Sequence, residues 1–259
     1  MIKAQHLKVK LSGKTILSDL SFEAHPGQVT SIVGPNGSGK TTLLRAMTGD
    51  LAYTGRVEIN GLDMQGQKPW ELATVRGVLP QASALAFPFS VVEVVNIGLQ
   101  GGRSGQSETV ASAALSRVGL AGYAHRPYQE LSGGEQQRVQ LARVLAQIWH
   151  PVEDGEARWL FLDEPVSALD ISHQLQVMNI ARDFADQGGG VVAVMHDLNL
   201  TAMFSDKMVL MANGQIKAAG QVVEVLTNDH LSSAYGCSVA VNQTPNGSVP
   251  FILPQAAVA

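Results

Sequence analysis

The sequence contains a single cysteine, Cys237, in 259 residues. One cysteine excludes an intrachain disulfide. Long hydrophobic runs are also missing, because no apolar stretch approaches the ~18–20 residues that a membrane-spanning helix needs. The first residues, 1–6, lack the apolar core of a signal peptide. These absences predict a soluble cytoplasmic chain whose contact with any membrane passes through a partner.

An excess of positive charge is absent as well. The chain has 18 Lys and Arg against 22 Asp and Glu, which gives a formal net charge of −4. No global basic field therefore favours a nucleic-acid partner. The proportions of hydrophobic residues (45%) and charged residues (15%) are ordinary for a globular protein of one large domain or two small ones.

What the sequence does contain is a glycine-rich stretch that fits the pattern G-x-x-x-x-G-K-[ST]. It consists of Gly34, Pro35, Asn36, Gly37, Ser38, Gly39, Lys40, Thr41 and Thr42. Residues 29–33 before it predict a buried parallel strand, and residues 42–47 after it predict a helix. An ordinary glycine-rich turn does not require both elements. We therefore interpret the stretch as a P-loop, in which the amides and dipole of a helix N-terminus attract phosphate.

A P-loop gives two of its side chains a chemical role. Lys40 is expected to reach the β- and γ-phosphates of a nucleotide, and the Thr41 hydroxyl is expected to ligate Mg²⁺. The expected ligands are therefore ATP and Mg²⁺.

Two carboxylates follow the apolar run at residues 159–162. Asp163 is expected to hold Mg²⁺ through water, and Glu164 to polarise the attacking water. The alternative, two exposed acids at a strand end, would be preferred if the sequence had no P-loop.

Two further polar residues stand at predicted strand ends. His196 follows the apolar run 191–195 and could bind the γ-phosphate and position water. Gln81 ends a short predicted strand at residues 78–81, and its amide could ligate Mg²⁺ and contact the attacking water. Taken alone, either residue is more often incidental.

A second motif that contains glycines lies in residues 131–138. Ser132 and Glu135 form the pattern of a capping box that opens a helix, and Gly133 and Gly134 leave the start of that helix bare. A bare helix N-terminus is a second anion-binding end. The apolar positions of the helix fall on one face and are Val139, Ala142, Leu145 and Ile148.

The coarse pattern predicts an α/β fold with a P-loop NTPase core and a mainly parallel sheet. Residues 2–11 and 17–25 alternate in polarity, which predicts an N-terminal antiparallel β subdomain. Residues 90–100 and 108–120 are helix-periodic. We expect one nucleotide-binding domain over 1–259, with residues 1–81 and 146–259 as its α/β catalytic core and residues 82–145 as a helical insert.

Four other segments carry simpler expectations. Residues 101–107 are rich in glycine and serine and predict a flexible connector, and residues 150–157 predict a surface loop. Residues 222–235 predict one helix, and residues 248–252 predict a weak strand in a proline-rich tail.

In order and spacing, these motifs resemble the ATP-binding cassette (ABC) family, and the match covers nearly the whole chain. The matching residues are the P-loop, Gln81, Leu131 to Gln136, Asp163 to Pro165, Ser167 to Asp170, and His196. The Ser132-Gly133-Gly134 signature is the most specific of them. The resemblance implies a head-to-tail homodimer with two ATP molecules between the subunits.

In that arrangement each ATP lies between the P-loop of one subunit and the signature of the other. The implied signature residues are Leu131, Ser132, Gly133, Gly134 and Glu135. The loop with Ser167 and Asp170 would lie at the dimer interface.

The resemblance also implies an activity, which is ATP hydrolysis that drives transport. The implied partners are two copies of a transmembrane permease and, indirectly, a periplasmic substrate-binding protein. The implied location is peripheral, at the cytoplasmic face of the bacterial inner membrane. Within the family the chain looks like importer ATPases for iron complexes and cobalamin. Residues 84–95 and the loop before Trp159 look closest to the hemin (haem) importers, with ferric siderophore or cobalamin as the alternative cargo.

One residue departs from the family pattern. Leu11 stands where the family usually has an aromatic residue that stacks on adenine, so we expect a loose base preference. Phe87 and Phe89 are interpreted either as core residues or as the lining of a groove for a permease helix.

Two other classes of function fit the sequence less well. A DNA-repair cassette would carry a long coiled coil, but this sequence has no sustained heptad repeat. Translation cassettes usually occur in pairs on one chain, whereas this chain has one. A small-molecule P-loop kinase would have no use for residues 131–138.

Overall fold

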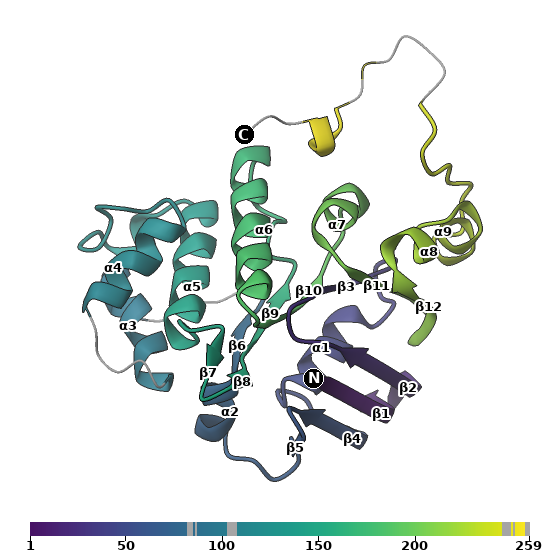
Figure 1. Cartoon of the computed structure of the whole chain (residues 1–259), viewed down its shortest axis with the longest axis horizontal. Coiled ribbons are helices and arrows are strands. Elements are labelled where there is room, and N and C mark those ends of the chain that lie inside the picture. Colours follow the sequence, from purple (N-terminus) through teal and green to yellow (C-terminus); the bar gives the residue numbers. More distant parts are fainter. Residues whose placement is uncertain (82–84, 86, 103–107, 245–249, 251, 257–259) are drawn as a thin grey trace.

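The computed structural model describes residues 1–259 except 82–84, 86, 103–107, 245–249, 251 and 257–259. Its centre is a six-stranded sheet with the order β12-β11-β3-β10-β9-β6 (Figure 1). The strands are β3 (Val29–Val33), β6 (Arg76–Leu79), β9 (Trp159–Asp163), β10 (Gly190–Val194), β11 (Lys207–Ala212) and β12 (Gln215–Gln221). All neighbours run parallel except β11 and β12, which form a hairpin. The predicted mainly parallel sheet is confirmed.

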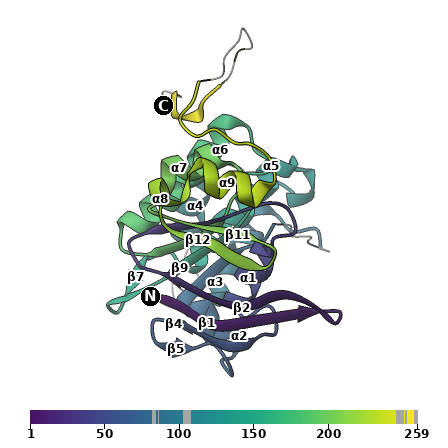
Figure 2. The same ribbon diagram turned by 90° about the vertical axis from the view of Figure 1, so that its right-hand side faces the viewer.

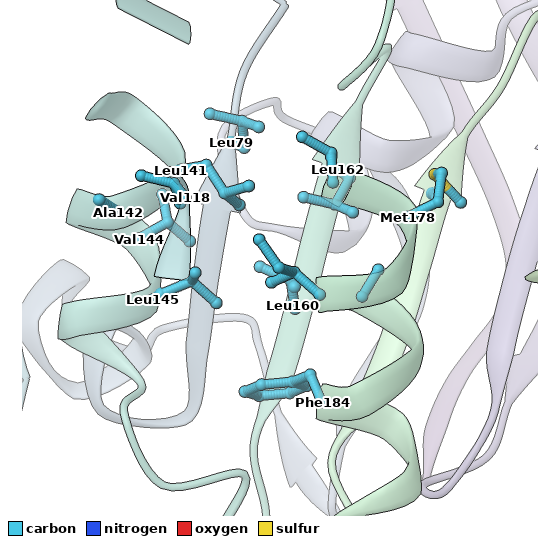
Figure 3. Close-up of a cluster of buried hydrophobic side chains, with 14 of the residues drawn as sticks. Leu79, Val118, Leu141, Ala142, Val144, Leu145, Leu160, Leu162, Met178 and Phe184 are labelled. Atoms are coloured by element: carbon cyan, nitrogen blue, oxygen red, sulfur yellow. The ribbon is translucent and has the colours of Figure 1, made fainter. Parts of the chain in front are cut away.

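The three central strands β3, β9 and β10 are buried along their whole length. Their residues alternate between two cores, because successive side chains of a strand point to opposite faces. On one face, Leu160 and Leu162 of β9 pack with α5 (Gly133–Gln147) and α6 (Ile171–Asp186), as Figure 3 shows. On the other face, Trp159 and Phe161 pack with α1 (Lys40–Met47) and the N-terminal sheet. Burial on both faces explains why these strands read as continuous apolar runs.

The N-terminal sheet is antiparallel, as predicted, with the order β2-β1-β4-β5 (Figure 2). Its strands are β1 (Ile2–Leu11), β2 (Lys14–Ala24), β4 (Thr54–Ile59) and β5 (Leu62–Asp63). Ser12 and Gly13, with φ of 48° and 79°, make the turn between β1 and β2. Helix α1 contacts this sheet and also β9 and β10 of the central sheet, so the P-loop helix is fixed between the two sheets.

Three helices from the predicted insert pack together beside the central sheet (Figure 1). They are α3 (Val91–Gly101), α4 (Glu108–Arg117) and α5, with a short 3₁₀ helix at Tyr128–Glu130 before α5. Gly98 allows α3 to approach α5 closely, because a Cβ there would lie 1.9 Å from the Arg143 carbonyl oxygen. The predicted helices at 90–100 and 108–120 are therefore present, the second ending at Arg117.

Residues 150–157 were predicted as a loop, and that prediction is wrong. They contain a two-stranded hairpin of β7 (Val152–Glu153) and β8 (Glu156–Ala157). The turn is Asp154-Gly155, with φ of 54° and 78°, and Arg158 forms an ion pair with Glu153. Strands of two residues are too short to produce a readable polarity pattern.

Residues 222–235 were predicted as one helix and form two, α8 (Val222–Val225) and α9 (Asn228–Tyr235). The break lies at Thr227, whose hydroxyl accepts a hydrogen bond from the His230 N–H (3.3 Å) and so caps α9. Two short helices were not predicted, α2 (Pro69–Val75) and α7 (Leu198–Phe204).

The expected connector at 101–107 and the weak strand at 248–252 fall largely outside the described residues. A short 3₁₀ helix, Pro254–Ala256, follows in the tail. Within the described ranges, no helix has both the length and the apolar character needed to span a bilayer.

Candidate nucleotide site

The carboxyl ends of four parallel strands meet at one edge of the central sheet. The P-loop follows β3, Gln81 follows β6 by two residues, Glu164 follows β9, and His196 follows β10 by two residues. This is the edge at which open α/β sheets bind ligands. A cleft of about 510 Å³ lies here, and it is lined by Leu11, Ile16, Asn36, Gly37, Gly39, Lys40, Thr41, Thr42, Gln81, Glu164 and His196. The sequence predicted most of these residues, and the fold brings them together.

The P-loop depends on glycine at its first position. Gly34 has φ of 145°, and a Cβ there would lie 2.0 Å from the Met211 carbonyl oxygen of β11. A hydrogen bond also joins the P-loop to the turn of the β11–β12 hairpin, because the Gly214 N–H donates to the Ser38 carbonyl (3.0 Å). A Cβ on Gly214 would in turn lie 2.0 Å from the Ile16 carbonyl oxygen. The Asn213-Gly214 turn is thus wedged between the P-loop and β2.

Lys40 folds back over the P-loop. Its side chain donates hydrogen bonds from Nζ to the carbonyls of Gly34 (2.8 Å) and Pro35 (3.2 Å), and the residue is only 6% exposed. Burial lowers the pKa of Lys40, while the negative charges of Glu164 and Asp163 oppose that shift. A buried ammonium bonded only to neutral carbonyls is ready to bind an anion.

Two further features fit a polyphosphate chain. The Ser38 hydroxyl is buried and has no hydrogen-bond partner among the described residues. Helix α1 begins at Lys40, so the amides of its first turn have no acceptor within the helix. Phosphate oxygens would satisfy both sets of donors.

Thr41 and Asp163 form the part of the site that fits a divalent cation. Thr41 Oγ1 donates to Asp163 Oδ1 (3.0 Å), and Asp163 is only 3% exposed. Hydroxyl and carboxylate oxygens are the donors that Mg²⁺ prefers, usually with waters and substrate phosphates completing the shell. No cluster of three or more His, Cys, Asp or Glu side chains suited to a metal occurs among the described residues.

Asp163 should make the stability of the nucleotide-free chain depend on pH. Burial raises its pKa, with the Thr41 hydrogen bond opposing the shift. Because the folded pKa lies above the unfolded value, the stability contributed by the protonated acid is complete below about pH 3.9 and is lost as pH rises through the folded pKa. We expect Asp163→Asn to raise the thermal midpoint by a few degrees at neutral pH, with the difference vanishing near pH 4. Thermal unfolding without nucleotide or Mg²⁺ measures this, and Asp229→Asn, at an exposed acid, is the control.

Each carboxylate oxygen of Glu164 contacts a neighbouring side chain. Gln81 Nε2 donates to Glu164 Oε2 (2.7 Å), and His196 Nε2 lies 2.5 Å from Glu164 Oε1. The three residues, which follow three different strands, form one hydrogen-bonded group. Glu164 also has φ of 53°, a left-handed conformation that costs a non-glycine residue about 1–3 kcal/mol. Strain of this kind is typical of functional sites and persists only where neighbouring groups enforce it.

The signature residues form the start of α5, as predicted. The Glu135 N–H donates to Ser132 Oγ (3.4 Å), and Glu135 Oε2 accepts from the Ser132 N–H (2.9 Å) and hydroxyl (2.8 Å). These hydrogen bonds lower the pKa of Glu135. The described residues that line the cleft do not include Leu131, Ser132, Gly133, Gly134 or Glu135.

Ser167 and Asp170 each have a partner within the chain. Ser167 Oγ donates to the Glu164 carbonyl (3.2 Å). Asp170 caps α6, where its carboxylate accepts from the His173 N–H (3.0 Å), and this contact lowers the pKa of Asp170. The segment between them connects the Glu164 loop directly to α6.

Two residues at the site were not singled out from the sequence. Ile16 lines the cleft beside Leu11. Gln137 donates from Nε2 to the carbonyls of Pro165 (2.9 Å) and Glu164 (3.4 Å). Gln137 lies just beyond the residues that match the family signature, and no local pattern announces a contact with a distant loop.

The pairing of Leu11 with Ile16 gives the cleft an aliphatic wall. Leu11 is 39% exposed, so a larger ring can be added without displacing the core. We expect Leu11→Phe to tighten ATP binding by about 2- to 10-fold, because aromatic stacking adds about 0.5–1.5 kcal/mol beyond burial. Calorimetric titration with ATP and GTP measures the change, and Leu62→Phe, at a leucine 37% exposed on β5, is the matched control. Equal affinities for Leu11→Phe and the wild type would show that the base lies elsewhere.

The fold and the grouping of P-loop, carboxylates, glutamine and histidine define a P-loop ATPase cassette. The model of the ABC transporter family matches residues 17–167, and the chain belongs to this family. It is therefore an ATP-binding protein and an ATPase of the ABC type.

Two relatives match the chain over nearly its full length. The chain is 59% identical to the Hemin import ATP-binding protein HmuV of Jannaschia sp. (strain CCS1), over 99% of this chain and 95% of the relative. It is 56% identical to the protein of the same name from Rhizobium johnstonii, over 100% of this chain and 99% of the relative.

Solved structures agree with the fold. The chain is similar to a bacterial Atm1-family ABC exporter with ATP bound, at 26% identity and a TM-score of 0.78, over 91% of this chain and 41% of that one. It is also similar to a dimeric bacterial ABC transporter cassette, at 26% identity and a TM-score of 0.74, over 86% of this chain and 99% of that one. The predicted ABC ATPase fold is confirmed.

Proposed function

We propose that this chain is the ATP-hydrolysing subunit of an importer that carries hemin across the bacterial inner membrane. The main observation in favour of ATP hydrolysis is that Gln81 and His196 both contact the Glu164 carboxylate in the cleft beside the P-loop. The cargo is supported by the two relatives named hemin import ATP-binding proteins, which match at 59% and 56% identity over nearly the full chain. Ferric siderophore or cobalamin is the alternative cargo.

In this proposal the amides of residues 34–42 and the Lys40 ammonium bind the phosphates of ATP. Glu164 polarises the attacking water, and His196 holds the Glu164 carboxylate and contacts the γ-phosphate. Thr41, Gln81 and, through water, Asp163 would hold Mg²⁺. Mg²⁺, when bound, neutralises charge on the β- and γ-phosphate oxygens.

We further propose that two copies form a head-to-tail dimer with two ATP molecules between them. Residues 131–135 of one copy would complete the cleft of the other, and Ser167 and Asp170 would lie at the interface. Support comes from the glycines at the start of α5, which do not line the P-loop cleft in the described part of the chain, and from the dimeric cassette of similar fold. The helical insert, residues 82–145, is the unit that would present the signature.

The dimer would drive two copies of a membrane permease, served indirectly by a periplasmic substrate-binding protein. This arrangement would place the chain peripherally at the cytoplasmic face of the inner membrane. The groove that receives the permease is proposed to include Phe87 and Phe89, whose rings pack edge to face with centroids 6.1 Å apart. Phe87 is exposed, which favours this interpretation for Phe87, whereas Phe89 is partly buried against the hydrophobic core.

The test is transport by a defined complex. The chain is co-purified with its permease, reconstituted into vesicles, and supplied in turn with hemin, a ferric siderophore or cobalamin together with the corresponding binding protein. We expect ATP-dependent uptake of hemin and hemin-dependent stimulation of ATP hydrolysis. Uptake of a siderophore or of cobalamin without hemin would move the cargo to the alternative, and salt-sensitive binding to DNA or ribosomes without a permease would replace the transport proposal.

A further inference from the structure

The backbone at Glu164 is held at three points around its left-handed conformation. Its N–H donates to the Val194 carbonyl (3.1 Å) of β10. Its carbonyl accepts from the N–H (3.4 Å) and the hydroxyl (3.2 Å) of Ser167. The third contact, from Gln137 Nε2 (3.4 Å), comes from outside this loop. A strained φ persists only where such contacts enforce it, so each contact bears on where the Glu164 side chain points.

Gln137 makes this contact from α5. Its amide nitrogen also donates to the Pro165 carbonyl (2.9 Å), so one side chain binds two successive carbonyls of the turn after β9. The amide oxygen of Gln137 is buried and has no partner among the described residues.

The position of Gln137 links two parts of the site. It lies one turn into the helix that begins at Gly133, and it lines a cavity of about 230 Å³ together with Gln81, Gly133 and Ser167. One wall of this cavity thus belongs to the signature helix, and another to the loop of the carboxylate. Gln137 is the side chain that bonds across them.

We propose that Gln137 is a positioning residue for ATP hydrolysis, which holds the turn at Glu164 so that the carboxylate stays between Gln81 and His196. This inference rests on the proposed role of Glu164. It predicts that the packing of α5 against the turn after β9, and not only nucleotide binding, sets the fraction of cassettes with a correctly directed carboxylate. Removing the amide should therefore lower kcat and leave the affinity for ATP unchanged.

The experiment compares Gln137→Met with Gln147→Met in the chain co-purified with its permease. Methionine keeps the length and shape of glutamine and removes the amide. Gln147 is the matched control because it ends the same helix and donates from Nε2 to two backbone carbonyls, those of Ala73 and Arg76 (both 2.8 Å), away from the cleft. We expect Gln137→Met to lower kcat about 10-fold, with KM and the Kd for ATP within about 2-fold of wild type, and Gln147→Met to keep wild-type kcat at a similar thermal midpoint.

The double variant separates positioning from loss of structure. In a Glu164→Gln background, measured in single-turnover assays, Gln137→Met should lower the residual rate less than about 2-fold, because the group that it positions is gone. The proposal is overturned by a wild-type kcat in Gln137→Met, by an equal loss in Gln147→Met, or by an undiminished 10-fold loss in the Glu164→Gln background. Normal turnover in Glu164→Gln alone would instead refute the proposed function of Glu164.

Discussion

Replacing Glu164 with glutamine is expected to lower ATP turnover by at least about 100-fold while ATP binding persists. The amide keeps the shape of the carboxylate but cannot take a proton from water or polarise it to the same degree. Gln81 (2.7 Å) and His196 (2.5 Å) each contact one oxygen of the Glu164 carboxylate. The substitution therefore removes a negative charge that has a polar neighbour at each oxygen. Since hydrolysis is the proposed step that reopens the dimer, the variant should accumulate as a closed, ATP-bound dimer.

Phosphate release and size-exclusion chromatography with Mg²⁺ and ATP measure these two effects. Glu23→Gln is the control, because Glu23 lies on β2 in a surface ion pair with Lys3 (3.6 Å) and outside the cleft. That variant should release phosphate at the wild-type rate and show no added dimer. Wild-type phosphate release from Glu164→Gln would remove Glu164 from its proposed role.

Replacing Lys40 with alanine is expected to abolish measurable turnover and hemin uptake and to weaken ATP binding more than about 10-fold. A hydrogen bond from a charged group is worth about 1.5–3 kcal/mol, and the Lys40 ammonium is the one P-loop side chain that brings positive charge to the phosphates. The fold should survive. Among the described hydrogen bonds Lys40 donates to two P-loop carbonyls, and burial already lowers its pKa.

Nucleotide titration, ATPase assays and thermal unfolding of Lys40→Ala separate binding from folding. Lys217→Ala is the control, since the exposed Lys217 on β12 contacts only the neighbouring Gln215 among the described hydrogen bonds (3.0 Å). A thermal midpoint equal to wild type together with lost ATP binding is the expected pair of results. Intact turnover and uptake in Lys40→Ala would overturn the whole account of the cleft.

The site was largely predictable because its residues follow buried parallel strands. β3, β9 and β10 are buried on both faces and rich in apolar or β-branched residues, so the residue after each run had to lie at one sheet edge. That reasoning gave Asp163, Glu164 and His196 as candidates for one site. It could not give the hydrogen-bonded group around Glu164, because the pairing of Gln81 and His196 with one carboxylate depends on strand order in space.

The rest depended on contacts that leave no local signature. Gln137 donates hydrogen bonds to carbonyls of a loop 27 and 28 residues away. The sequence around a helical glutamine does not show whether its amide contacts a distant loop or solvent. The hairpin at 152–157 was missed although Asp154-Gly155 is a turn dipeptide, since its strands have only two residues each. Thr227 could have been recognised as a cap, and it divides a segment whose apolar pattern alone favours one helix.

The wedged turn at Asn213-Gly214 has a practical consequence for engineering. Hairpin tips are ordinarily the safest places to insert a peptide tag or a fluorophore. Here the tip fills the space between the phosphate loop and the N-terminal sheet, so even a one-residue graft should abolish ATP binding. The Asp154-Gly155 tip leaves open space around its glycine, and it is the place where a reporter should be accepted without loss of nucleotide affinity.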